Sequence, residues 1–98
     1  MRQLRIYVKG QVIGVGFRAW TRLKARELGI KGWVKNVYNK PEIFGVNGGV
    51  EICCQGSQEQ LNEFLKLVKK GPETAVVEET IEFWEQPQQI MEDFNVIK

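Results

Sequence analysis

The sequence predicts an α+β fold in which two helices cover one face of an antiparallel sheet of four to five strands. Apolar and polar residues alternate in four short segments, which is typical of strands with one buried face. In two other segments apolar residues recur every three to four positions, as on one side of a helix. A chain of 98 residues suits one domain with a modest core, and we expect residues 1–98 to form it.

The first part of the chain predicts a strand, a helix and a second strand. Residues 4–10 alternate in polarity, and residues 18–28 have helical spacing. Gly29 stands where a helix commonly ends. Residues 30–37 then predict the second strand, which leads into a long connection from Tyr38 to Gly49.

A third strand at 50–55 leads into the clearest helix. Ser57 and Gln60 have the spacing of a capping box, and Gly71-Pro72 ends the segment. A fourth strand is expected around Val77 to Phe83. A short last strand is expected at 94–97. The resulting order, β-α-β-β-α-β with a tail strand, predicts a ferredoxin-like split βαβ sandwich.

The composition excludes several classes of protein. No apolar run approaches the roughly 20 residues that span a bilayer, and the first residues lack the pattern of a signal peptide, so we expect a cytoplasmic protein. Cys53 and Cys54 are adjacent, so in a strand they point to opposite faces and do not form a disulfide with each other. The chain has no histidine, and therefore lacks the commonest general base and zinc ligand.

Charge is distributed unevenly along the chain. Residues 1–40 hold ten Lys and Arg and one acid, whereas residues 41–98 hold four lysines and eleven acids. Two interpretations stay open. The opposite charges could solvate different faces of the domain, or the basic part could attract an anionic ligand.

The segment from Val8 to Arg18 is the strongest functional signal. It predicts a strand, a glycine-spaced loop and the first turn of a helix that carries an arginine. Glycines allow successive backbone N–H groups to face one concavity, a helix N-terminus adds free N–H groups, and a guanidinium matches phosphate oxygens. We therefore expect a phosphoryl-binding cradle built from the backbone of the following residues: Ile13, Gly14, Val15, Gly16, Phe17 and Arg18.

Two segments resemble the signatures of the acylphosphatase family. Val8 to Arg18 matches the first signature at every fixed position except Ile13, where the family usually has glutamine. Gly32-Trp33-Val34-Lys35-Asn36 resembles the second, and the glycine, valine and glycine that complete it are present downstream. Eleven residues separate Asn36 from Gly48 where the family usually has three. This longer loop could be a lid, a specificity element or a passive insertion.

The resemblance implies metal-independent hydrolysis of an acyl phosphate to a carboxylate and inorganic phosphate, without a covalent intermediate. The expected catalytic residues are Arg18, which holds the phosphoryl oxygens, and Asn36, which orients the attacking water. No metal or other cofactor is expected. The partner is a small acyl phosphate, and we expect a monomer that binds neither nucleic acid nor membrane. Ile13 is expected to change rate or substrate preference while the backbone N–H at this position still binds.

Two alternatives remain open from the sequence. The same architecture serves RNA recognition, although the third strand lacks the aromatic residues that stack on bases. A protein of this kind would bind anions or RNA without catalysis. The substitution at Ile13 and the long loop could also mark an acylphosphatase-like protein with reduced activity.

Overall fold

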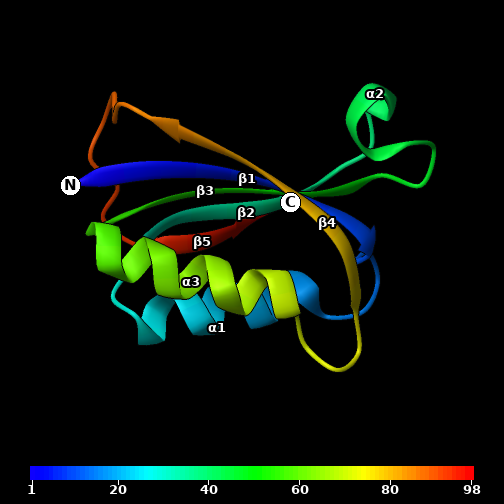
Figure 1. Cartoon of the computed structure of the whole chain (residues 1–98), viewed down its shortest axis with the longest axis horizontal. Coiled ribbons are helices and arrows are strands. Elements are labelled where there is room, and N and C mark those ends of the chain that lie inside the picture. The colour runs from blue at the N-terminus through cyan, green and yellow to red at the C-terminus, as the bar shows by residue number, and fades with distance from the viewer.

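Every helix and strand that the sequence predicts is present in the computed structural model, which describes residues 1–98 and confirms the α+β class. The strands are β1 (Arg2–Gln11), β2 (Lys31–Val37), β3 (Gly49–Gly56), β4 (Val76–Glu85) and β5 (Phe94–Ile97). The helices are α1 (Phe17–Glu27), α2 (Pro41–Phe44) and α3 (Gln58–Lys70). Figure 1 shows α1 and α3 side by side against one face of the sheet, as expected.

The five strands form one mixed sheet in the order β4-β1-β3-β2-β5. All neighbouring strands are antiparallel except β2 and β5, which are parallel. The sequence predicts a purely antiparallel sheet, so the parallel pairing of β2 with β5 corrects that prediction. The reason is topological: β4 ends beside the start of β1, and the following connection crosses to the opposite sheet edge at that same end. The chain therefore enters β5 next to the start of β2 and runs in the same direction.

The main core lies between the sheet and the two long helices. Leu4, Ile6 and Val8 of β1 are fully buried and face the helices, because alternate residues of a strand share a face. From α1, Phe17 and Ala25 complete this layer. Since Phe17 is the first residue of α1, the core fixes the place where the helix begins.

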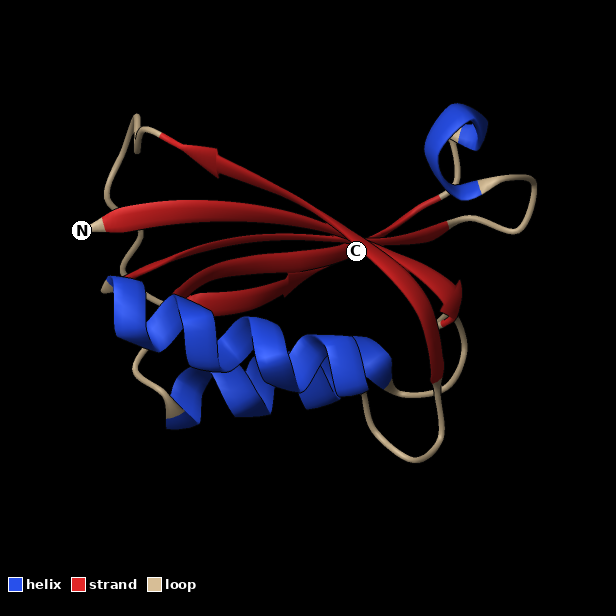
Figure 2. Cartoon of the chain, viewed as in Figure 1, coloured by secondary structure: helices blue, strands red, loops and turns tan.

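The long connection after β2 contains the short helix α2, which the sequence did not predict. Phe44 at its end is buried and packs edge-on against Tyr7, with 5.7 Å between the ring centroids. Val37 completes this small second cluster. Figure 2 shows α2 away from the two long helices, so the connection is anchored on the opposite side of the sheet.

Local sequence signals in the second half are confirmed. The Ser57 hydroxyl accepts a hydrogen bond from the Gln60 N–H, and the Gln60 side chain accepts one from the Ser57 N–H, which forms the predicted capping box. Cys53 and Cys54 are free thiols, both buried. No helix in the structure combines the length and the apolar character that crossing a membrane requires.

Candidate active site

The loop between β1 and α1 is fixed at both ends by the core. Val12 and Phe17 flank it, and each is about 1% exposed. Between them Gly14 and Gly16 adopt φ angles of 77° and 78°, in the left-handed region that side-chain-bearing residues rarely enter. A Cβ atom at either glycine would meet no other atom within 4 Å. The loop therefore needs these glycines for backbone conformation, and not to make space.

The backbone N–H groups of this loop have no acceptor within the protein. None of those from Ile13 to Ala19 donates a hydrogen bond to another protein group, and the first bond of the helix runs from Trp20 N to Gly16 O at 3.1 Å. Gly16 is the N-cap and offers no side-chain oxygen to the first turn. A run of free donors at a helix N-terminus is the arrangement that binds an oxyanion.

The loop opens into a pocket of about 380 Å³ that contains the predicted arginine. Its lining includes Gly14, Gly16, Arg18, Arg22, Val96 and Lys98, and no aspartate or glutamate side chain. Arg18 is half-buried and makes no ion pair or hydrogen bond with another side chain. Because no acid neutralises these cations and the helix N-terminus adds positive potential, the pocket favours an anion.

Asn36 lies near the end of β2, on the face that the helices cover. It shares this face with Val34, which is fully buried in the core two residues earlier. The Asn36 amide Nδ2 donates to the Tyr38 hydroxyl at 3.1 Å, while its Oδ1 atom is buried and has no hydrogen-bond partner. An amide with an unused polar atom is available to interact with another molecule.

The structure places Arg18 and Asn36 in two separate pockets that share no lining residue. The link between them is β5. Val96 pairs with Val34 and also lines the Arg18 pocket. Continued by two residues, the register of this pair brings Lys98 beside Asn36. The ends of β1, β2 and β5 therefore converge here.

Ile13 does not present a polar side chain to the cradle. Its side chain is partly buried and packs against the main core. The isoleucine thus exchanges a polar group for apolar contact, while its backbone N–H stays free like the others of the loop.

Arg22 and Lys98 line the pocket but were not singled out from the sequence. The sequence did contain a signal for Arg22. Residues four apart on a helix share one side, so the spacing of Arg18 and Arg22 predicts that they lie together. Nothing local indicated Lys98, since its place depends on the pairing of β5 with β2.

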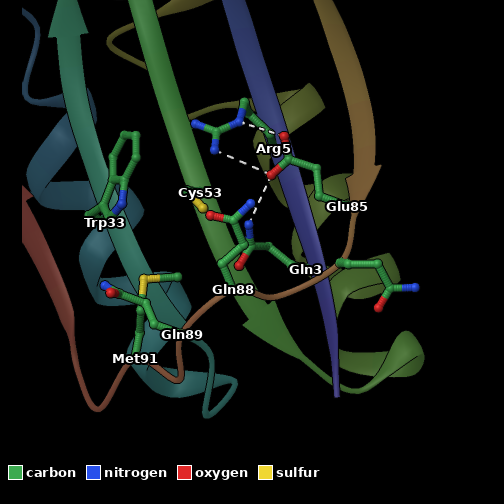
Figure 3. A pocket seen from close by; sticks show the side chains of 9 residues that line it. Gln3, Arg5, Trp33, Cys53, Glu85, Gln88, Gln89 and Met91 are labelled. Carbon is green, nitrogen blue, oxygen red and sulfur yellow. Dashed lines mark hydrogen bonds and ion pairs between the residues drawn. The ribbon is translucent and has the colours of Figure 1, made fainter.

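A second pocket lies on the opposite face of the sheet and also contains an arginine, but its surroundings differ from those of Arg18. It measures about 440 Å³ and contains Arg5 with Trp33 and Glu85 (Figure 3). The Arg5 guanidinium donates to Glu85 Oε2 at 2.9 Å and also pairs with Glu51. These hydrogen bonds raise the pKa of Arg5 and keep it charged, but its charge is already balanced. This pocket is therefore a poor site for a phosphoryl group.

Comparison with known proteins decides the family. The family model described as acylphosphatase matches residues 4–96. The chain belongs to the acylphosphatase family. An acylphosphatase from Archaeoglobus fulgidus is 49% identical over 77 residues, which cover 79% of this chain and 78% of the relative. The crystal structure of the acylphosphatase from Bacillus subtilis covers all of both chains with a TM-score of 0.87 and 31% identity. An acylphosphatase structure from Coxiella burnetii covers 98% of this chain and 92% of its own, with a TM-score of 0.84 and 29% identity.

The family assignment agrees with the position of both sequence signatures. The first runs from β1 through the loop of free N–H groups to Arg18, and the second begins on β2 and ends with β3. The loop of the first signature and Asn36 of the second thus lie toward the end of the sheet at which the pocket opens.

Proposed function

We propose that this acylphosphatase hydrolyses the carboxyl-phosphate bond of small acyl phosphates at the β1–α1 loop. The supporting observation is the set of backbone N–H groups from Ile13 to Ala19 without acceptors, beside a guanidinium without an acid. A phosphoryl group satisfies both at once. Its oxygens accept hydrogen bonds from the N–H groups of residues 13–18 and from Arg18.

The chemistry requires positioning and charge stabilisation more than proton transfer. Phosphoryl transfer passes through a loose transition state whose charge is spread over the equatorial oxygens, and preorganised donors stabilise that charge. The leaving group is a carboxylate, which departs without a general acid. The lack of histidine is therefore no obstacle.

Asn36 is proposed to orient the attacking water through its side-chain amide. The water oxygen forms a bond to phosphorus as the bond between phosphorus and the acyl oxygen breaks, and that electron pair leaves with the carboxylate. The proton of the water passes to a phosphoryl oxygen of the substrate. No covalent enzyme intermediate forms.

We further propose that the chain works as one domain over residues 1–98, as a cytoplasmic monomer without a metal ion, and without nucleic acid or membrane as partner. The argument for metal independence is chemical: the side chains that line the pocket are cationic or apolar, and include none of the carboxylates, thiols and imidazoles that hold divalent ions.

The experiment is turnover of benzoyl phosphate in the presence of EDTA, by wild type and by R18A and N36A. R18A should lower kcat/KM about 1,000-fold, because it removes the charged donor of the transition state. N36A should lower kcat about 100-fold with little change in the inhibition constant of inorganic phosphate, because water orientation does not contribute to anion binding. Lys66→Ala, which removes an exposed charge on α3, is the matched control.

Three results would contradict the proposal. Activity that survives R18A would place the phosphoryl group elsewhere. Loss of activity with EDTA would indicate a metal. Salt-dependent RNA binding without turnover of any acyl phosphate would indicate a binding module instead.

A further inference from the structure

One side of α1 presents three arginines along β5, but only the one farthest from the cradle is neutralised. Arg26 donates to Asp93 at 3.2 Å and to the backbone oxygen of Phe94 at 3.0 Å. Arg18 and Arg22 make no ion pair, and both line the cradle pocket. Residues at positions i, i+4 and i+8 form one ridge of a helix. Arg18, Arg22 and Arg26 therefore share a ridge, and the first two carry unpaired positive charge.

A phosphoryl group bound in the loop is too small to contact Arg22 as well. Four residues of α-helix rise about 6 Å along the axis, which is more than the width of a phosphoryl group. The loop N–H groups and Arg18 already surround that group from the helix N-terminus. Arg22 lies one turn farther from this N-terminus and lines the same pocket together with Val96 of β5.

The pocket contains no aspartate or glutamate side chain. Arg22 is exposed. It makes no ion pair, as is true of most cations of the chain, but unlike most of them it shares a pocket with the anion-binding loop and Arg18. Unpaired cations that share a pocket with an anion-binding loop attract a second anionic group. A guanidinium binds a carboxylate or a phosphate with two parallel hydrogen bonds.

We infer that Arg22 selects acyl phosphates whose acyl group carries a second anionic group. This inference rests on the proposed function, because it concerns the substrate of that same pocket. The phosphoryl group occupies the loop, and the acyl group extends between α1 and β5, where its carboxylate or phosphate meets Arg22. Arg22 is a specificity residue and takes no part in bond breaking.

The test compares rigid substrates that differ in one charge. 4-Carboxybenzoyl phosphate and 4-carbamoylbenzoyl phosphate have nearly the same shape, and neither can cyclise. The 3-substituted pair places the second group nearer to the phosphoryl group. 3-Phosphonobenzoyl phosphate shows whether Arg22 favours a phosphate-type anion over a carboxylate. The quantity measured is the ratio of kcat/KM between the anionic and the neutral member of each pair.

In wild type we expect the anionic member to be favoured in at least one pair, through a lower KM. R22Q should reduce that ratio about fivefold, because Arg22 contributes one solvent-exposed charged contact. R22K should retain most of it, because the charge remains. The ratio should also fall with added salt. Lys66→Gln removes the same charge from α3 and should leave the ratio unchanged.

Two results would overturn the inference while the proposed function stands. One is a wild type that turns over both members of every pair without favouring the anionic one. The other is a ratio that is the same in R22Q and wild type. Failure to turn over any of these substrates would overturn the proposed function, and this inference with it.

Discussion

Arg5 and Arg18 are both half-buried guanidiniums, yet their surroundings give them opposite roles. Arg5 lies on the open face of the sheet between two glutamates and also approaches the ring of Trp33, with 5.7 Å to its centroid. Arg18 lies in the first turn of α1 beside free N–H groups and pairs with no acidic side chain. A guanidinium that is already paired stabilises the fold, whereas an unpaired one can bind a ligand. Arg5 is therefore a structural residue.

The partner of Arg5 makes stability depend on pH. Hydrogen bonds, first from Arg5 and then from Gln3, hold the pKa of Glu85 below its usual value. A carboxyl with a lowered pKa in the folded state stabilises the fold at pH values above its unfolded pKa of about 4.3, and this contribution is lost as pH falls through the folded pKa. Glu85→Gln should thus lower the free energy of unfolding by about 1 kcal/mol at pH 7.

Urea unfolding at pH 7, 5, 4 and 3 checks this expectation. The difference between wild type and Glu85→Gln should be largest at pH 7 and should shrink as the pH falls below the unfolded pKa of about 4.3, because Glu85 becomes protonated in wild type. Glu63→Gln, an exposed glutamate of α3 without an ion pair, should show no such difference. A difference that stays constant across this range would mean that Glu85 acts through packing.

At the scale of elements, α2 bears on the role of the long connection after Asn36. The sequence left open whether this connection is a lid, a specificity element or a passive insertion. Phe44 packs on Tyr7 and Val37, on the face opposite α1. A segment fixed to that face does not cover the pocket of Arg18. The structure therefore favours the passive interpretation for the part that contains α2, whereas Tyr38, at the start of the connection, accepts a hydrogen bond from the Asn36 amide.

Phe44→Ala tests this interpretation. The substitution should cost about 2 kcal/mol of stability, less than a deletion in the main core, because the cluster is small and can collapse. At a temperature where the variant stays folded, kcat/KM for benzoyl phosphate should change less than about twofold. Val46→Ala, at a 94% exposed position of the same connection, should change neither quantity. A tenfold loss of kcat/KM in folded Phe44→Ala would instead support a lid.

Elements with local signals were predictable, and those that depend on distant contacts were not. The helix after Ser57 has its cap, its apolar spacing and its stop within fifteen residues. The helix α2 has only four residues, and it is held by Phe44 against strands that are distant in sequence. The direction of β5 follows from where β4 ends, which no periodicity reveals.

At the scale of the whole molecule, the candidate site is assembled from three separate segments. The sequence identified the β1–α1 loop and Asn36, because each is part of a contiguous signature. It gave no indication of Val96 or Lys98, which reach the pocket only through the parallel pairing of β5 with β2. The geometry of the pocket thus depends on the attachment of the last strand.

Gln55 attaches the segment that leads to β5. Its side chain is 1% exposed and makes three hydrogen bonds. The amide donates to Gln3 Oε1 at 2.8 Å and to the backbone oxygen of Gln89 at 2.7 Å, and its oxygen accepts from Met91 N at 2.9 Å. Two of the three bonds join β3 to the connection between β4 and β5. Their loss leaves two partly buried backbone groups without partners.

Gln55→Ala should therefore destabilise the protein by about 2–3 kcal/mol and loosen one region more than the rest. Amide hydrogen exchange of residues 86–97 should accelerate more than that of α3. The inhibition constant of inorganic phosphate should rise severalfold although Arg18 is intact, because Val96 and Lys98 lose their fixed place in the pocket. Gln58→Ala, which removes only an exposed hydrogen bond to Asn62, is the control. Uniform acceleration across the chain, or unchanged phosphate binding, would show that the last strand holds its position without Gln55.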